Sequence, residues 1–297
     1  MGPLTRSPTR PRAADAQSTG VTRSRPAWRA RAIDKRAVRI ERVTVIGLLH
    51  PGAMGSAVGA ALVKRGHRVL WASEGRTSAT AKRAREAQLE DAGELSVLFA
   101  SSEIVLSICP PDAALEVAAL AADFEGIFVD ANAIAPQTAL EVGETVGGSY
   151  VDGGIIGPPP KRAGTTRMYL WGERAGEVAS AFAGTRVDAP VLAVTGPMAA
   201  SALKMTYGAW TKGSAALLLA IARTAAALGV EGSLREEWTL SQPQLSERLA
   251  AAQRDAAEKG WRWTGEMREI AATFARADQP EGFHLAAAEV YDDSGAR

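Results

Sequence analysis

The sequence predicts an α/β domain with a doubly wound parallel sheet, followed by an all-helical domain that a long helix joins to it. Three observations support this fold class. Between residues 42 and 171, short apolar runs alternate with helical stretches, which is typical of a parallel sheet covered on both faces. Residues 198–230 contain no proline and are rich in Ala and Leu. The remainder, to about Asp292, consists of amphipathic segments separated by breaker residues.

The elements can be placed in chain order. Strands are expected where apolar residues run together, at 43–47, 68–72, 103–109, 126–130, 150–157 and 167–171. Helices are expected at 55–66 and 77–89, and 198–230 as a single helix would be about 50 Å long. The later helices are expected to be separated by Gly232-Ser233, Ser241-Gln242-Pro243 and Gln279-Pro280.

Composition excludes several classes of protein. Cys109 is the single cysteine, which rules out an intramolecular disulfide and a cysteine-based zinc site. Three histidines argue against a multi-histidine centre, so no metal is expected. Residues 1–42 hold 11 Lys/Arg and 3 Asp/Glu, whereas the other 255 residues hold 23 and 30, so the folded part offers no basic groove for nucleic acid. No uncharged apolar run approaches the roughly 18 residues of a membrane span. We expect a cytoplasmic protein with a small-molecule partner and with neither nucleic-acid nor membrane binding.

Residues 1–41 differ in texture from the rest. They are rich in Arg, Pro, Ser and Thr and lack an apolar period that could build a core, so we expect a basic, disordered tail. A secretory signal is disfavoured because there is no apolar central region. A transit peptide, a solvated extension and an upstream start codon chosen in error remain open.

A glycine-rich turn is the most informative feature. The stretch VTVIGLLHPGAMGSAVGAA runs from a strand through glycines into a helix, which favours a dinucleotide-binding turn with the pyrophosphate at the helix N-terminus. The usual G-x-G-x-x-G spacing is lengthened by three residues between its first and second glycines. We therefore assign residues 42–196 to an NAD(P)-binding Rossmann domain and 197–297 to a helical substrate and dimerisation domain. The candidate cofactor-binding residues of the turn are Gly47, Leu48, His50, Pro51, Gly52, Ala53, Met54 and Gly55.

The residues after the second strand indicate which cofactor is bound. Ser73, Arg76 and Thr77 offer a guanidinium and hydroxyls suited to a 2′-phosphate, so NADP(H) is favoured over NAD(H). Glu74 would support NAD(H) if it pointed inward, because a carboxylate at this place binds the ribose hydroxyl. A plain polar loop with a helix cap is the remaining interpretation.

Lys204 is the candidate catalytic residue of the helical part. It lies in the apolar stretch ASALKMTYGAW, where a charge requires a reason. A general acid or base needs a proton-exchanging group on a rigid element; the alternative is a solvated helix lysine. Helical spacing places Tyr207, Gly208 and Thr211 on its face and Lys212 about 80° round. Tyr207 is either a further catalytic group that hydrogen-bonds substrate or a packed aromatic.

Together these motifs resemble the β-hydroxyacid dehydrogenase and 6-phosphogluconate dehydrogenase-like superfamily over roughly residues 42–292. The resemblance rests on IGLLHPGAMG, VDANAIAP, YVDGGIIGPPP and GPMAASALKMTYGAWTKG in this order. The lengthened turn and the Trp-rich C-terminal half most resemble a poorly characterised branch with an unassigned helical domain. DGGIIGPPP is also similar to the corresponding stretch of imine reductases.

The resemblance implies roles for further residues. Cys109, Pro110, Pro111 and Asn132 match loops beside the cofactor, and Lys204 matches the general acid/base. Relatives carry Ser-Gly-Gly for the substrate carboxylate where this chain has Ile156, Gly157 and Pro158, and two asparagines where it has Tyr207 and Gly208. Ile156, Gly157, Pro158, Gly208 and Thr211 are therefore the candidate substrate residues, without the usual carboxylate clamp.

These observations predict an NADPH-dependent oxidoreductase that transfers hydride to or from a small carbonyl or hydroxy compound. An imine reductase or reductive aminase, or a non-catalytic NADP(H)-binding protein, are the alternatives. The long helix carries more apolar surface than its own domain readily covers, so we expect a homodimer. Further aromatic and polar residues line a substrate pocket or form the core and dimer interface: Trp261, Trp263, Met267 and His284.

Overall fold

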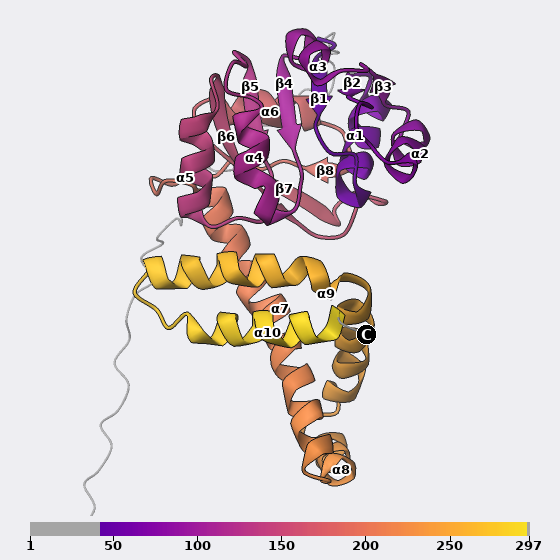
Figure 1. Ribbon diagram of the computed structural model, residues 1–297, viewed down its shortest axis with the longest axis vertical. Helices are drawn as coiled ribbons and strands as arrows, with labels where there is room; N and C mark the ends of the chain where they lie inside the picture. Colours follow the sequence, from indigo (N-terminus) through magenta and orange to yellow (C-terminus); the bar gives the residue numbers. More distant parts are fainter. Residues whose placement is uncertain (1–41, 296–297) are drawn as a thin grey trace, which may run out of the picture. The chain divides into compact units, whose positions relative to one another are not determined.

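The computed structural model describes residues 42–295, so the predicted tail 1–41 lies outside the described residues. Within this range, an eight-stranded sheet has the strand order β3-β2-β1-β4-β5-β6-β7-β8 (Figure 1). Strands β1 to β6 pair in parallel, β7 is antiparallel to β6, and β8 is parallel to β7. The strands are β1 (Val45–Leu48), β2 (Arg68–Trp71), β3 (Glu90–Asp91), β4 (Ile104–Ser107), β5 (Ile127–Asp130), β6 (Ser149–Ile156), β7 (Thr166–Trp171) and β8 (Val187–Asp188).

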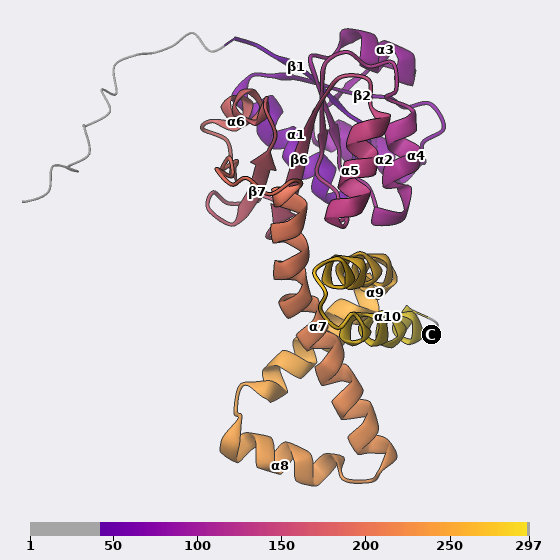
Figure 2. The ribbon, with the colours of Figure 1, turned by 90° about the vertical axis from the view of Figure 1, so that its left-hand side faces the viewer.

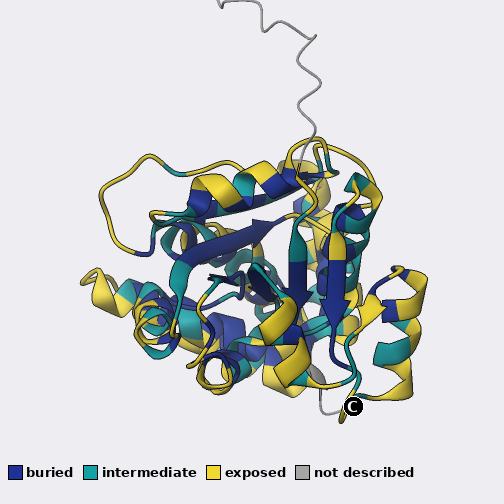
Figure 3. Cartoon of the chain, turned by 90° about the horizontal axis from the view of Figure 1, so that it is seen from above, coloured by how far each residue is buried: buried dark blue, intermediate teal, exposed yellow. Residues whose placement is uncertain are grey.

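Helices cover both faces of this sheet, as the doubly wound prediction requires. Because side chains alternate along a strand, Leu48 and Leu106 pack in one core with α1 and α6, whereas Val105 and Phe128 pack in another with α3 to α5. The central strands β4 and β5 are buried along their whole length, and most of the sheet interior is buried (Figure 3). The helices are α1 (Ala53–Arg65), α2 (Ser78–Glu86), α3 (Leu95–Ser101), the short 3₁₀ helix η1 (Pro111–Ala113), α4 (Ala114–Ala119), α5 (Pro136–Thr145) and α6 (Ala175–Phe182).

The long helix and the all-helical part are confirmed as well. Helix α7 (Ala199–Ala227) is 29 residues long and is followed by α8 (Glu231–Ser241), α9 (Leu245–Arg276) and α10 (Gly282–Gly295). Helices α9 and α10 lie side by side and cross α7 (Figures 1 and 2). A separate core joins these three helices around Met205, Met267 and Tyr291.

One predicted helix break is wrong. Gly232-Ser233 lies inside the first turn of α8, and the chain turns instead at Gly229, whose φ is 72°. Glycine enters this left-handed region without the Cβ clash that other residues meet, so Gly229 ends α7. The short elements β3, α3, α6 and β8 lacked a clear sequence period and were not individually predicted.

The described residues 42–295 also bear on membrane and metal sites. Of the helices in this range, none combines the length and apolarity that crossing a bilayer requires. No group of three or more His, Cys, Asp or Glu side chains in the same range is placed to hold a metal ion.

Candidate active site

The carboxyl ends of the parallel strands bring most of the predicted cofactor residues to one edge of the sheet. Leu48 pairs with Leu106, and Ser107 pairs with Asp130, so the loops after β1, β4 and β5 leave the sheet together. The strand order reverses between β1 and β4, and open α/β sheets bind ligands at such a switch point.

The glycine-rich turn has the geometry of an anion-binding helix start. Gly52 directly precedes α1 and no side chain caps this helix, which leaves the amides of its first turn available to an anion. A Cβ on Gly55 would lie 2.2 Å from the carbonyl oxygen of His50. Only glycine allows the lengthened turn to fold back so closely. The imperfect motif therefore keeps the physical role of its last glycine.

Two arginines hold the extra residues of this turn. Arg76 donates from Nη2 to the Leu49 carbonyl at 3.2 Å, and Arg83 donates from Nε to the Pro51 carbonyl at 3.0 Å. Arg83 was not among the predicted site residues. Its position on α2, one turn after Thr80, to which it also donates at 3.0 Å, is the signal that was available.

The same corner contains a hydrogen-bonding atom with no partner. Burial and then the nearby charge of Arg76 lower the pKa of His50 to about 4, so its ring is neutral at pH 7. Its Nδ1 is buried and has no hydrogen-bond partner among the described residues. Thr77 caps α2 by accepting a bond from the Thr80 amide at 3.3 Å, while Glu74 is exposed. An orphaned nitrogen and two guanidinium groups fit a phosphate-bearing nucleotide.

Asn132 belongs to a buried polar network at the ends of β4 and β5. Its amide nitrogen donates to Ser107 Oγ at 3.1 Å and to Asp130 Oδ2 at 2.9 Å. Its oxygen accepts the Cys109 amide at 2.6 Å. The Asn132 side chain therefore fixes the two loops to each other. In the loop after β4, the predicted cofactor residue Pro110 is exposed and Pro111 is half-buried.

Helix α7 begins directly on strand β6. The Asp152 carboxylate accepts the backbone amides of Ala200 and Ser201 at 2.8 and 3.1 Å and the Ser201 hydroxyl at 2.6 Å. A Cβ on Gly154 would lie 2.6 Å from the Ala200 carbonyl oxygen and 3.1 Å from Lys204 Cβ. The Asp-Gly-Gly sequence thus places the stem of Lys204 against the sheet.

Lys204 is not a solvated helix lysine. Its side chain is only 15% exposed, and its Nζ lies 3.5 Å from Glu266 Oε1. Lys212 Nζ lies 2.7 Å from the same oxygen. Burial lowers the pKa of Lys204 and the charge of Lys212 lowers it further, against the opposing effect of Glu266. Burial would raise the pKa of Glu266, but the two lysines outweigh it and hold that pKa below its ordinary value.

The neighbours of Lys204 on α7 divide between two sides of the helix. Gly208 is buried against α9, where its added Cβ would lie 3.1 Å from Ile270 Cδ1. Tyr207 is 47% exposed, so it is not packed within this chain. The exposed Thr211 donates its hydroxyl back to its own helix, at 3.4 Å from the Gly208 carbonyl.

Helix α9 supplies the acid that the sequence reading missed. Glu266 is separated from both lysines by more than 50 residues along the chain, and it lies on the buried face of α9. On the same helix, Glu269 accepts the Ala135 amide at 2.6 Å and the Thr138 hydroxyl at 2.8 Å at the start of α5. A lone acid within the apolar face of a helix was the signal that could have identified Glu266.

The segment at the end of β6 is a turn that depends on glycine. Ile156 is buried, and strand alternation places it on the same face as Gly154. Gly157 has φ 118°, and a Cβ there would lie 2.2 Å from the Thr165 carbonyl oxygen. The Pro158 carbonyl accepts the Thr166 hydroxyl at 2.6 Å. Residues 156–158 carry no hydroxyl, and Pro158 has no backbone N–H. The turn therefore lacks two donors that could bind a substrate carboxylate.

The aromatic and polar residues of the C-terminal half have mostly structural surroundings. Met267 is fully buried, and Trp263 packs edge-on against Tyr291 with ring centroids 5.2 Å apart. His284 is buried against Phe274. Trp261 differs because it is 65% exposed. Trp263, Met267 and His284 therefore belong to the helical core, which agrees with the core interpretation.

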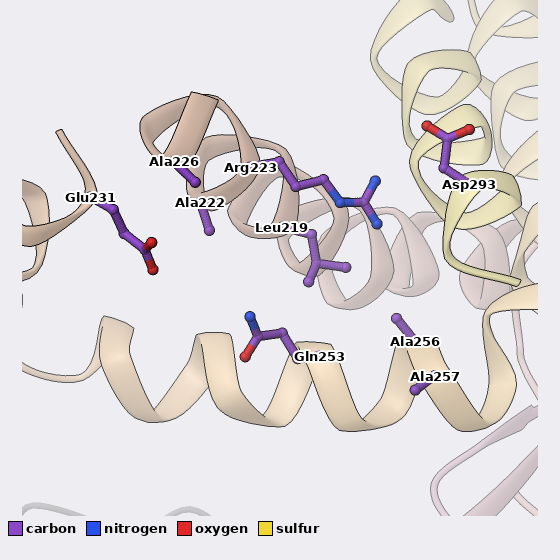
Figure 4. Close-up of a pocket in the computed structure, with 9 residues that line it drawn as sticks. All are labelled: Leu219, Ala222, Arg223, Ala226, Glu231, Gln253, Ala256, Ala257 and Asp293. Carbon is purple, nitrogen blue, oxygen red and sulfur yellow. The ribbon is translucent and has the colours of Figure 1, made fainter. Parts of the chain in front are cut away.

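A cavity elsewhere in the helical part is separate from these residues. About 350 Å³ in volume, it lies between α7, α8, α9 and the end of α10 (Figure 4). The side chains of Arg223 of α7 and Gln253 of α9 are among those that line it (Figure 4). None of the predicted site residues lines it.

Solved structures share this fold. A conserved protein of unknown function, described as structurally similar to 3-hydroxyacid dehydrogenases, matches with a TM-score of 0.63 and 25% identity over 84% of this chain and 96% of that chain. A Mycobacterium tuberculosis 3-hydroxyisobutyrate dehydrogenase with L-serine gives 0.62 and 18%, over 86% and 94%. An Aspergillus terreus reductive aminase in complex with NADPH and ethyl-5-oxohexanoate gives 0.50 and 18%, over 85% and 94%. The chain has the hydroxyacid dehydrogenase fold.

The C-terminal helices also match a family model. Residues 225–294 match the model described as "Domain of unknown function (DUF1932)", which covers α8 to α10 and the last residues of α7. A search of the curated proteins finds no match to the chain. The resemblance predicted from the motifs is thus confirmed at the level of the fold and of this C-terminal domain.

Proposed function

We propose that this protein is an NADPH-dependent oxidoreductase that acts on a small carbonyl or hydroxy compound, with Lys204 as its general acid/base. The observation that carries the proposal is the buried Lys204, fixed over Gly154 beside the carboxyl ends of the strands and ion-paired with Glu266. A buried lysine with a lowered pKa suits proton exchange near neutral pH. The dehydrogenase fold supports the reaction class.

The first turn of α1 and the two arginines would hold the cofactor. The uncapped amides after Gly52 would bind the pyrophosphate. Arg76 and Arg83, with the hydroxyls of Ser73 and Thr77, would bind the 2′-phosphate, which favours NADP(H) over NAD(H). When bound, the cofactor would supply or accept the hydride.

Lys204 would handle the proton that accompanies this hydride. In reduction, its ammonium group donates a proton to the carbonyl oxygen as that oxygen becomes a hydroxyl. In oxidation, the neutral amine accepts the hydroxyl proton as the carbonyl forms. Glu266 stabilises the ammonium form, so the lysine keeps a proton to give despite its burial. The nearby Gly208 and Ile156 would form an apolar side of the substrate site.

A reductive aminase or imine reductase is the second candidate. The 156–158 turn favours it, because this turn lacks the hydroxyl and one of the amides that would clamp a carboxylate substrate. In that case Lys204 would protonate or deprotonate an amine nitrogen. A third candidate, an NADP(H)-binding protein without turnover, is separated from both by the assay below.

The test measures NADPH oxidation by nicotinamide absorbance against small oxo acids, aldehydes and ketones, each with and without added amine. Turnover with the carbonyl alone supports the proposal, and turnover that requires amine supports the second candidate. Lys204→Met is expected to abolish turnover while leaving NADPH affinity within about twofold, because the lysine acts on the substrate. Lys259→Met, at an exposed surface pair with Asp255, is the matched control. NADPH binding without turnover of any compound would favour the non-catalytic alternative.

A further inference from the structure

One carboxylate serves two lysines in the candidate active site. Glu266 Oε1 lies 2.7 Å from Lys212 Nζ and 3.5 Å from Lys204 Nζ, and all three side chains are at most 15% exposed. With all three groups ionised, the cluster carries one uncompensated positive charge. Burial makes that charge costly, so one lysine must release its proton more readily than the other.

The contacts of Lys212 favour its charged form. Its ammonium makes the short hydrogen bond to Glu266, and charge-assisted bonds of this length are the strong ones. The same nitrogen lies 5.8 Å from the centre of the Trp263 ring, a distance at which an aromatic face attracts a cation. The Lys212 carbonyl accepts the Tyr291 hydroxyl at 2.7 Å, which fixes this turn of α7.

Lys204 makes the weaker contact with Glu266. Its distance to Glu266 exceeds that of a good hydrogen bond, and Lys212 and Arg262 both act on it as like charges. We propose that Lys212 and Glu266 are positioning residues that divide the two lysines, so that Lys212 remains an ammonium ion and Lys204 is the one that exchanges its proton. The catalytic purpose rests on the proposed function, but the order in which the lysines lose protons does not.

Other charged or titratable groups lie on the elements that pack against α7. Asp152 of β6 is occupied by the start of α7. His284 of α10 lies near Gly213, where its Nδ1 would be 3.6 Å from an added Cβ, and burial lowers its pKa. On α9, Glu269 is occupied by the start of α5, and Arg262 acts on Lys204 as a like charge. On α10, the Tyr291 hydroxyl is occupied by the Lys212 carbonyl.

The test follows the titration of Lys204 directly in cofactor-free protein. Lysine labelled with ¹³C at Cε reports the protonation of each side chain by NMR, and the Lys204 signal is assigned by its loss in Lys204→Arg. Lys212→Met removes a like charge, so the titration midpoint of Lys204 is expected to rise by at least one pH unit. Glu266→Gln removes the opposite charge and is expected to lower it by at least one pH unit.

Two controls keep the result specific. Lys212→Arg retains the charge and should leave the midpoint near that of the wild type, whereas a merely structural role of Lys212 would not distinguish Arg from Met. Lys259→Met should have no effect. Unchanged midpoints in both Lys212→Met and Glu266→Gln, or loss of the Lys212 proton before that of Lys204, would overturn the proposal.

Activity provides an independent reading. If the protein is the proposed oxidoreductase, the pH profile of turnover shifts in the same direction as the NMR midpoint in each variant. If the Lys204 midpoint rises in Lys212→Met and falls in Glu266→Gln but no compound is turned over, the order of proton loss is supported and the proposed function is contradicted. Turnover with unshifted Lys204 midpoints would support the proposed function and contradict the order of proton loss.

Discussion

The carboxylate of Asp152 lies 2.6 Å from the Ser201 hydroxyl, and it also accepts the amides that open α7. A strand residue therefore caps the helix that carries Lys204. Capping by a carboxylate satisfies otherwise unpaired amides and interacts favourably with the positive end of the helix. The position of Lys204 relative to the sheet depends on this single side chain and on the glycine two residues later.

Asp152→Asn is expected to destabilise the protein by about 1–3 kcal/mol, because the amide cannot accept all three bonds of the buried carboxylate. We expect lower turnover with unchanged NADPH affinity. Urea unfolding and fluorescence titration with NADPH measure the two effects. Asp188→Asn, at an exposed position on β8, serves as the control. A variant as stable as the wild type would show that the cap is not needed.

Gly154→Ala places a methyl group 2.6 Å from the Ala200 carbonyl oxygen. This clash is relieved only if β6 and α7 move apart. We expect a loss of about 1–3 kcal/mol, the usual range for overpacking. Gly176→Ala is the matched control, because an added Cβ there meets nothing within 4 Å. Equal melting temperatures for the two variants would contradict the close packing of α7 on β6.

Arg76→Ala and Arg83→Ala are expected to weaken NADPH binding about 10-fold or more each, since each removes a charge-assisted contact worth about 1.5–3 kcal/mol. NADH binding should change less, because it lacks the 2′-phosphate. Nicotinamide fluorescence gives both affinities. The control is Arg85→Ala, because Arg85 is exposed on α2, the helix that carries Arg83. This variant should leave both affinities unchanged. An equal loss for NADH and NADPH would place the arginines at the pyrophosphate instead.

Asp130 is expected to make stability fall as pH rises. Burial raises the pKa of this carboxyl to about 7, so between the unfolded and folded pKa values the folded state binds more protons. From about pH 6 to about pH 8 this loss amounts to about 1 kcal/mol. His50, whose folded pKa is depressed, acts in the opposite sense. The measurement therefore compares wild type with Asp130→Asn by urea unfolding at both pH values. If the free energy of unfolding changed equally with pH in the two proteins, the prediction would be contradicted.

Association into a homodimer remains a prediction. A groove of about 420 Å³ lies on α7 and α8, with Leu217, Ile221 and Leu228 among the residues that line it, and these three side chains are exposed. We expect the double variant Leu217→Asp/Ile221→Asp to be monomeric by light scattering, because two buried charges oppose association. Leu115→Asp, exposed on α4, should leave the mass unchanged. A wild-type monomer at micromolar concentration would refute the prediction.

Much of the fold could be predicted because its signals are local. Strands β1, β4 and β5 are short apolar runs that contain β-branched residues, and α7 lacks any proline over its length. The two-residue strands β3 and β8 have no such signal, since only their pairing with longer neighbours makes them strands. The break at Gly229 was misplaced because glycine also occurs at 232, and sequence alone does not show which one adopts a positive φ.

The site was predictable only where its residues are close together in the chain. The turn at 47–55 and Arg76 were found from a local motif, and Lys204 from its apolar neighbours. Glu266 reaches the lysines only through the crossing of α7 and α9, and Asp152 caps a helix that begins 47 residues later. Helical spacing also set Lys212 apart from Lys204. Its long, flexible side chain nonetheless reaches the same carboxylate.

Helix α9 contacts three separate parts of the chain within five residues. A Cβ on Gly265 would lie 2.9 Å from Asp112 in the loop after β4, Glu266 pairs with the lysines, and Glu269 caps α5. So short a helical span is effectively rigid, so these contacts cannot vary independently. A ligand that displaces the loop after β4 is therefore expected to change the environment of Lys204. By thermodynamic linkage, protonation of that lysine must in turn alter the affinity for such a ligand.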